Sequence, residues 1–358
     1  MTDLFDPVQL GALGLRNRIV MSAMTRSRAG PGDTPTALHE EYYRQRAGAG
    51  LIVTEGVQPS SAGKGYCRTP GLYSEAQIAG WERVAQAVHA EGGLIVAQLM
   101  HCGRVASHIN KADGSEIVAP SAIRAEAKIF TDECGLVDID MPRALETAEV
   151  VDTIGEYRAA AVNARAASLD GVELHCSSGY LPMQFLSSNS NQRTDRYGGS
   201  VQNRVRFVTE VLRAMGEAIG FDRVGLRICP GFEYNDIHDE DPVETYGLLL
   251  DEASRMDLAY LHLVRRTFPK IDNHALVKAR WRGNLILNNE LTPESAREAV
   301  RTGEAQAVSF GRPFIGNPDL VDRIRLGAPL ADYDPSKLYT PGPEGYIDYP
   351  VASAPDAL

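Results

Sequence analysis

Eight short, β-rich apolar runs alternate with longer segments of helical periodicity, and this alternation constrains the fold more than any other feature of the chain. The runs are residues 17–23, 51–56, 94–99, 171–176, 224–229, 259–264, 284–289 and 307–312. Several of the intervening segments begin with a Ser or Thr that can cap a helix, such as 74–93 and 200–220. Apolar strands that alternate with helices indicate a parallel sheet buried on both faces. Eight strand–helix units predict a closed (β/α)8 TIM barrel.

The length of 358 residues suits either one barrel or two smaller domains, and the eight units favour one domain over residues 1–358. About seventy residues separate the third run from the fourth. This insertion, at about 105–146, carries turn signals and the apolar piece SEIVAPSAI, and we expect it to form a hairpin or lid that caps the barrel mouth. The tail after Asp332 is rich in Pro, Gly and Tyr and predicts an ordered wrap rather than a helix.

The overall charge excludes several classes of function. A net charge of −11 and a pI near 5.3 disfavour nucleic-acid binding and a membrane-surface role, which both need a basic face. No apolar run reaches the ~20 residues of a membrane span, and MTDLFDPVQL does not resemble a signal peptide. The five cysteines lack CxxC spacing, so neither a disulfide framework nor a zinc site is predicted. We expect a cytoplasmic protein.

Polar side chains stand at the ends of the predicted strands, where barrel enzymes place their chemistry. In chain order these residues are Met24, Thr25, Arg26, Glu55, Gly56, Gln98, His101, Arg104, His175, Tyr180, Arg227, Asn288, Asn289, Gly311 and Arg312. The loops after the seventh and eighth strands commonly bind phosphate through backbone N–H groups and an arginine. A small-molecule ligand that carries a phosphate is therefore expected at this face.

Arg227 lies within an apolar strand, where an unpaired charge costs several kcal/mol, so it must face an acceptor. A flavin ring needs such a cation, together with an amide such as that of Gln98. Pairing of Arg227 with an internal carboxylate such as Glu173 is the alternative.

Other groups of residues give weaker indications of function. His175 with Ser177 or Ser178 could be a hydrolytic dyad, but CSSGY lacks the GxSxG elbow. Histidine spacing gives no metal motif. We expect His101 and Arg104 to support the pocket floor. A basic cluster placed at the barrel mouth either recognises the 2′-phosphate of NADPH or forms a solvated face; it comprises Arg265, Arg266, Lys270, Lys278, Arg280 and Arg282.

Several motifs together resemble the old yellow enzyme family of FMN-dependent ene-reductases, the NADH:flavin oxidoreductases. The motifs are NRIVMSAMTRSR, the KGY of residues 64–66, APSAIR, ELHxxxGYLxxQFLSxxxNQRTDxYGGS, FGRPFIGNPDLV and EGYIDYP. They occur in the family's order from about Leu4 to Tyr349, and the GYLxxQFLSxxxNQRTDxYGGS stretch is very specific.

The resemblance implies FMN as bound cofactor and assigns residues to it. Positions that match flavin-ring contacts are Ala23, Met24, Thr25, Gly56, Gln98 and Arg227. Positions that match the residues binding the FMN phosphate are Asn289, Gly311 and Arg312. Thr25 is expected near the hydride-carrying nitrogen of the ring. Arg227 is expected to stabilise the reduced anion.

The resemblance also implies a reaction. NADPH or NADH would reduce FMN and leave, and the flavin would then pass hydride to the β carbon of an enone or nitroalkene. His175 matches one of two residues that hold the substrate carbonyl oxygen, and Tyr180 matches the proton donor to the α carbon. Tyr66 and Tyr339 match aromatic walls of the substrate pocket.

Two departures from the family pattern concern the substrate site. Ser178 stands where the family has a second His or an Asn, and its shorter side chain offers one hydrogen-bond donor. Met100 stands where relatives often carry Trp, which reshapes the pocket.

Other functions remain open at this point: a flavin-assisted isomerase, a flavin redox sensor without turnover, or a barrel lyase or aldolase. The presence of Tyr180 counts against the isomerase, and no strand-end lysine supports a Schiff base. A monomer and a homodimer are both compatible with the sequence.

Overall fold

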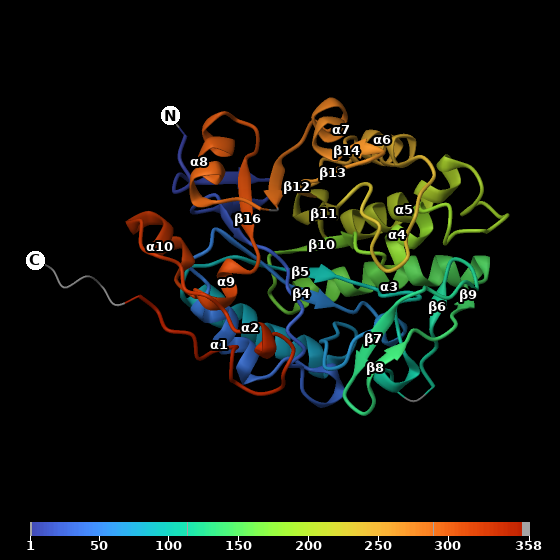
Figure 1. Cartoon of the computed structure of the whole chain (residues 1–358), viewed down its shortest axis with the longest axis horizontal. Helices are drawn as coiled ribbons and strands as arrows, with labels where there is room; N and C mark the ends of the chain where they lie inside the picture. Colours follow the sequence, from blue (N-terminus) through green and yellow to red (C-terminus); the bar gives the residue numbers. More distant parts are fainter. Residues whose placement is uncertain (1, 113, 289, 353–358) are drawn as a thin grey trace, which may run out of the picture.

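The computed structural model describes residues 2–112, 114–288 and 290–352. Eight parallel strands close into a barrel, and each strand pairs with the barrel strand that follows it along the chain (Figure 1). The barrel strands are β3 (Ile19–Met21), β4 (Leu51–Val57), β5 (Ile95–Leu99), β10 (Gly171–Cys176), β11 (Val224–Ile228), β12 (Tyr260–Val264), β15 (Leu285–Asn288) and β16 (Ala307–Phe310). Each strand coincides with one of the eight apolar runs, so the predicted (β/α)8 barrel is confirmed.

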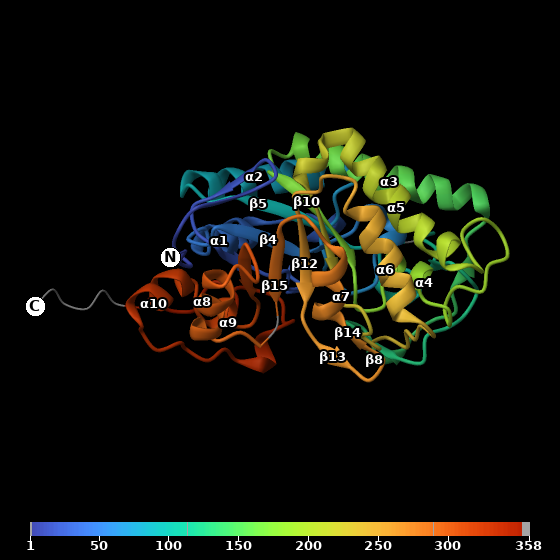
Figure 2. The same ribbon diagram turned by 90° about the horizontal axis from the view of Figure 1, so that it is seen from above.

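Helices surround the barrel (Figures 1 and 2). Those of eight or more residues are α1 (Ala37–Gln45), α2 (Glu75–Ala90), α3 (Thr147–Ala166), α5 (Val201–Ile219), α6 (Pro242–Ala253), α7 (Asn273–Arg280) and α8 (Pro293–Arg301). The expected caps are present at several starts: Ser74 Oγ accepts from Gln77 N at 3.3 Å, and Ser200 Oγ accepts from Asn203 N at 3.3 Å. Three shorter helices are α4 (Leu181–Leu186), α9 (Pro313–Gly316) and α10 (Leu320–Leu326). Among the described residues no helix is long and apolar enough to cross a membrane.

The register of the strands brings polar residues side by side. Residues paired in a parallel ladder point to the same face of the sheet. Glu173 pairs with Gln98, while Arg227 pairs with His175 on one side and with His262 on the other. This register lines up polar side chains that lie far apart in the sequence.

The insertion after β5 contains the expected hairpin, but in a different stretch from its most apolar piece. β7 (Lys128–Thr131) and β8 (Gly135–Asp138) pair antiparallel, and Gly135, the first residue of β8 after the turn, has φ +67°. The piece 115–123 supplies only β6 (Val118–Ala119), which pairs in parallel with β9 (Arg143–Ala144). Ile129 of the hairpin packs in one cluster with Met100 and Tyr180, so the hairpin covers one wall of the barrel mouth.

The tail forms the ordered wrap that its composition predicts. Two arginines from the segment after β3 bind its backbone carbonyls: Arg26 donates to Leu338 O and Gly345 O, and Arg28 donates to Gly342 O. Tyr346 is fully buried and stacks on Tyr42 of α1 at 4.0 Å between ring centroids. The C-terminal segment is therefore part of the packed structure next to the flavin-facing segment expected from sequence.

Two small hairpins lie outside the eight-strand pattern. β1 (Val8–Leu10) and β2 (Leu13–Leu15) form the first, and Ala12 N donates to Asp222 O at 2.8 Å, just before β11. This hairpin therefore covers the N-terminal end of the barrel. The second, β13 (Thr267–Phe268) with β14 (Ile271–Asp272), follows β12 at the opposite end.

Candidate active site

A buried polar network centred on Glu173 lies inside the barrel. Glu173 Oε1 accepts from Gln98 Nε2 at 2.7 Å, and Oε2 lies 2.8 Å from His262 Nδ1. The other ring nitrogen of His262 lies 2.7 Å from Ser309 Oγ. Burial alone would raise the pKa of Glu173, but His262 and Arg227 together with the bond from Gln98 lower it to about 2. Glu173 is therefore a carboxylate whose two oxygens are both engaged.

The same network fixes the tautomer of His262. Burial and the charge of Arg227 lower the pKa of His262, so the ring is neutral. A neutral ring donates from Nδ1 to Glu173 and accepts at Nε2 from Ser309.

Arg227 lies above this network and is half-buried. Its Nη1 donates to Ser22 Oγ at 2.9 Å, and its Nη2 donates to Asn288 Oδ1 at 3.2 Å. Nη1 also lies 2.9 Å from His262 Nε2, so His262 stands between Arg227 and Glu173. The alternative of direct pairing between Arg227 and Glu173 is therefore wrong in detail, although the carboxylate still balances the guanidinium charge. Burial lowers the pKa of Arg227, and Glu173 opposes that effect.

His175 lies near the end of β10, and Tyr180 lies just after this strand, at the start of α4. Both are 8% exposed, and their rings meet edge to face at 5.0 Å between centroids. Burial and the nearby charge of Arg227 lower the pKa of His175 to about 3, so its ring is neutral. His175 Nδ1 has no hydrogen-bond partner in the described part of the chain. Because Nδ1 is closed to solvent, the ring can meet a ligand atom only through its other nitrogen, Nε2.

Tyr180 keeps its proton at neutral pH because burial raises the pKa of its hydroxyl well above 10. Its Oη donates to Tyr66 Oη at 3.1 Å. Tyr180 is also the N-cap residue of α4, and the next residue, Leu181, donates its N–H to His101 O at 2.9 Å. The hydroxyl is therefore positioned from both sides of the mouth.

Ser178 occupies a strained turn rather than a regular strand end. Its φ of +58° lies in the left-handed region, and Gly179 follows at φ +79°. A Cβ at Gly179 would lie 2.5 Å from Tyr234 O, so the turn needs glycine there. The Ser178 hydroxyl lies 3.4 Å from Ser177 Oγ.

Asn235 is a residue that the sequence reasoning missed. It lies in the loop 229–241 after β11, with φ +56°, and its Nδ2 donates to Ser178 O at 2.8 Å. Its side chain also hydrogen-bonds Tyr66, whose pKa is raised by burial and lowered in part by the bonds to Tyr180 and Asn235. The loop has no periodicity, and its place after the end of the fifth strand is the only signal that could have found Asn235.

Gly56 and Met100 fit one another. A Cβ at Gly56 would lie 2.4 Å from Met100 Cε, so the absence of a side chain on β4 makes room for the buried thioether. Ala23, Met24 and Thr25 are half-buried after β3.

The remaining expected site residues lie around the rim. Gly311 is half-buried, and Arg312 is exposed at the start of α9. Asn289 lies outside the described residues. Tyr339 is 57% exposed on the tail, where its carbonyl accepts from Arg68 Nη2 at 2.7 Å.

His101 and Arg104 lie beneath the site, and both are fully buried. Burial lowers the pKa of His101 to about 3, and its Nδ1 accepts from Gly103 N at 3.0 Å. Arg104 Nη2 donates to the carbonyl and carboxylate oxygens of Asp236. Arg104 therefore ties the loop that carries Asn235 to the exit of β5.

The expected basic cluster does not gather at the barrel mouth. Helix α7 carries the chain back toward the N-terminal end of the barrel, and Arg282 lines a surface hollow there with Gly11 of the first hairpin. Arg280 pairs with Asp251 at 2.8 Å, and Arg265 pairs with Glu304 at 3.2 Å. Only Arg266 and Lys270 stay near the loop 229–241. The prediction of one cluster was wrong because α7 runs back along the barrel, so that residues before and after this helix lie at opposite ends.

Comparisons with known proteins agree on one family. The family model described as the NADH:flavin oxidoreductase / NADH oxidase family matches residues 3–331. A probable flavin mononucleotide-dependent alkene reductase of Leishmania infantum is 39% identical over 97% of this chain and 97% of its own. 12-Oxophytodienoate reductase 7 of Oryza sativa subsp. japonica is 37% identical over 98% and 95%.

Solved structures agree with these matches. Morphinone reductase in complex with tetrahydroNAD is 43% identical, with a TM-score of 0.94 and coverage of 99% of this chain and 98% of that one. The old yellow enzyme homologue of Zymomonas mobilis is 37% identical, with a TM-score of 0.94 and coverage of 98% and 100%.

Proposed function

The chain belongs to the NADH:flavin oxidoreductase / NADH oxidase family, the old yellow enzyme family of NAD(P)H-dependent FMN oxidoreductases, and from this premise we propose that it reduces the activated C=C bond of α,β-unsaturated carbonyl or nitro compounds. The observation that carries this proposal is the pairing of His175, neutral and with a free ring nitrogen, with Tyr180, which keeps its proton. His175 can donate a hydrogen bond to an oxygen of the substrate, and Tyr180 can give a proton to one of its carbons.

The residues at the barrel mouth fit FMN. Gln98 is fixed through its amide nitrogen to Glu173, so its oxygen is presented as an acceptor for a ring N–H. Arg227 supplies a cation for the edge of the ring on which negative charge grows. Gly311 is open, since an added Cβ would meet nothing closer than 3.6 Å, and exposed Arg312 beside it suits a phosphate. When bound, FMN supplies hydride transfer between the nicotinamide and the alkene.

His175 stabilises the charge that develops during reduction. The carbonyl or nitro oxygen of the substrate gains negative charge as the β carbon is reduced. The ring N–H of neutral His175 can be donated to that oxygen, and burial of the ring strengthens this bond. Because the ring is neutral before substrate binds, no buried cation has to be desolvated.

Tyr180 gives its hydroxyl proton to the α carbon, which completes the addition of hydrogen across the bond. The phenolate that remains faces Tyr66, whose hydroxyl lies 3.1 Å away and can donate to it. Asn235 holds Tyr66 and the carbonyl of Ser178, so we assign it a positioning role.

Ser178 reaches less far toward a substrate oxygen than His or Asn would. Because the Ser178 hydroxyl lies beside Ser177 Oγ, we expect His175 to be the principal donor and a water to bridge Ser178 to the oxygen. We therefore expect weaker carbonyl binding than a second long donor would give.

An anaerobic half-reaction tests the proposal. The flavin of the purified protein is reduced and then mixed with cyclohexenone, and the visible flavin band is followed. The band should return rapidly in the wild type and about 10²- to 10⁴-fold more slowly in Tyr180→Phe, while Tyr346→Phe, a buried tyrosine of the tail, should behave as wild type. Flavin that stays reduced with both enones and nitroalkenes would refute the function, and a fast Tyr180→Phe variant would refute the role of Tyr180.

A further inference from the structure

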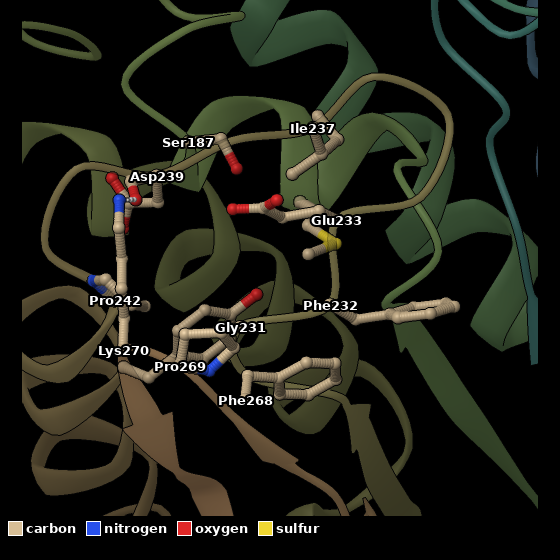
Figure 3. A pocket seen from close by; sticks show the side chains of 12 residues that line it. Ser187, Gly231, Phe232, Glu233, Ile237, Asp239, Pro242, Phe268, Pro269 and Lys270 are labelled. Carbon is tan, nitrogen blue, oxygen red and sulfur yellow. Dashed lines mark hydrogen bonds between the residues drawn. The ribbon is translucent and has the colours of Figure 1, made fainter.

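A second cavity, of about 240 Å³, lies behind the loop 229–241 and outside the candidate active site (Figure 3). It is bordered by this loop, the β13–β14 turn and the helices α4 and α6, and it is partly open to solvent. Its lining residues are Met183, Ser187, Gly231, Phe232, Glu233, Ile237, Asp239, Pro242, Tyr246, Phe268, Pro269 and Lys270. His175, Tyr180 and Arg227 do not contribute to it, so the cavity is distinct from the site of reduction.

Two polar atoms of buried side chains in this lining lack a partner among the described residues. Tyr246 is 1% exposed, and its Oη makes no hydrogen bond. The Asp239 side chain is 7% exposed, and its Oδ2 is also unpartnered. Native proteins rarely leave such atoms unsatisfied, so a ligand or water is needed at this place. Asp239 and Tyr246 both line this one cavity, so one ligand group can serve both side chains.

The charged groups around the cavity already balance one another. Asp239 Oδ1 accepts from Arg204 Nη2 at 3.4 Å, and Glu233 lies 2.7 Å from His238 Nδ1. Lys270 donates to Asp239 O at 3.2 Å, and Figure 3 shows its side chain running along one side of the cavity toward Asp239. A charged ligand would disturb this balance and bear the cost of burial, whereas a neutral one would not.

The rest of the lining is mainly apolar and suits a ring. Phe232 and Phe268 lie 6.1 Å apart between ring centroids, and Met183, Ile237 and Pro269 add further apolar surface. An apolar cavity of ~150 Å³ is enough to bind benzene. The volume here leaves room for a six-membered ring and a substituent.

We propose that this cavity binds a small neutral ring compound that carries a hydroxyl group. The hydroxyl donates to Asp239 Oδ2 and accepts from Tyr246 Oη, which satisfies both free atoms, and the ring packs among Phe268, Met183 and Ile237. The site does not depend on the reaction proposed above.

The cavity wall touches the catalytic turn. Met183 Sδ accepts from Gly179 N at 3.3 Å, and a Cβ placed on Gly179 would lie 3.1 Å from Ile237 Cγ1. A bound ring therefore supports the two elements that hold the turn between Ser178 and Tyr180.

Crystals of the FMN-loaded protein soaked with 4-bromobenzyl alcohol test the proposal, because bromine is located by its anomalous signal. Occupancy over a series of soak concentrations gives a half-saturation value for each site separately. We expect bromine in the cavity, with half-saturation about fivefold higher in Tyr246→Phe because one hydrogen bond is lost. The matched control is Tyr346→Phe, which removes another buried, unpartnered hydroxyl far from the cavity and should leave half-saturation unchanged.

Other outcomes of these soaks would contradict the proposal. Bromine found only at the active site, or a cavity that holds only water at every concentration, overturns the proposal. Equal half-saturation for wild type and Tyr246→Phe refutes the assigned hydroxyl contacts. 4-Bromotoluene, which lacks the hydroxyl, should bind more weakly than the alcohol, and binding of equal strength would contradict the polar part of the site.

Discussion

Replacing Glu173 with Gln removes the carboxylate charge that balances Arg227 inside the barrel while it keeps the shape of the side chain. Glu173 is fully buried and engages Gln98 and His262 at 2.7 and 2.8 Å. An amide at this position has one oxygen and one NH₂ group, so it cannot accept from both neighbours. The NH₂ group would face a donor, and the Arg227 guanidinium would lose its counter-charge.

The expected loss of stability follows from the burial. Removing one partner of a buried ion pair in direct contact costs about 3–5 kcal/mol, because the other charge remains uncompensated. His262 separates Arg227 from Glu173, so we expect a loss near the lower end, about 3 kcal/mol. Guanidinium denaturation of the FMN-loaded protein measures this difference, and Glu217→Gln on the exposed face of α5 is the control, expected to change stability by less than about 0.5 kcal/mol. A loss below about 1 kcal/mol for Glu173→Gln would refute the charge balance that we assign.

The pH dependence gives an independent check. The pKa of Glu173 is lowered in the folded protein from 4.5 to about 2, so its ionised form favours folding. That contribution is fully present above pH 4.5 and is lost as the pH falls toward 2. The stability gap between wild type and Glu173→Gln should therefore be constant from pH 5 to 8 and shrink below pH 4.5. A gap that grows as the pH falls would contradict the lowered pKa.

Three further predictions concern single side chains. Because the pKa of His175 is lowered to about 3, enone-dependent flavin reoxidation should show no His175-linked step between pH 5 and 8, and a step that disappears in His175→Asn would contradict this. Ser178→Asn should strengthen enone binding, since Asn tolerates the positive φ and adds a longer donor; unchanged or weaker affinity would oppose our account of Ser178. Tyr246→Phe should stabilise the ligand-free protein by about 1 kcal/mol in thermal unfolding because a buried unpartnered hydroxyl is removed, and a comparable loss would mean that water satisfies it.

The parts of the fold that local patterns encode were predictable from the sequence. Each barrel strand is a continuous apolar run because both faces are buried, and capping residues such as Ser74 and Ser200 mark helix starts directly. The polar residues at strand ends were recognisable because the C-terminal ends of all eight strands meet at one mouth.

Features set by register and loops were not predictable in the same way. The bond between Glu173 and His262 joins residues 89 positions apart, and only the alignment of the three strands β10, β11 and β12 brings them together. Asn235 and the cavity at Tyr246 depend on the path of the irregular loop 229–241, which follows no period. The prediction of one basic cluster was wrong for a related reason. Residues that are close in sequence lie at opposite ends of the barrel when a helix connects them.

The contacts of Arg26 with the tail bear on how the chain folds during synthesis. Its bond to Gly345 O joins residues 319 positions apart, so the ribosome must have made every residue from Arg26 to Gly345 before this contact can form. Closing so large a loop is slow compared with the local pairing of β3 with β4. The nascent barrel can therefore assemble strand by strand while the segment around Thr25 still lacks its last support. Completion of this segment, to which we assign contacts with FMN, becomes a late event, timed by the arrival of the tail residues rather than by closure of the sheet.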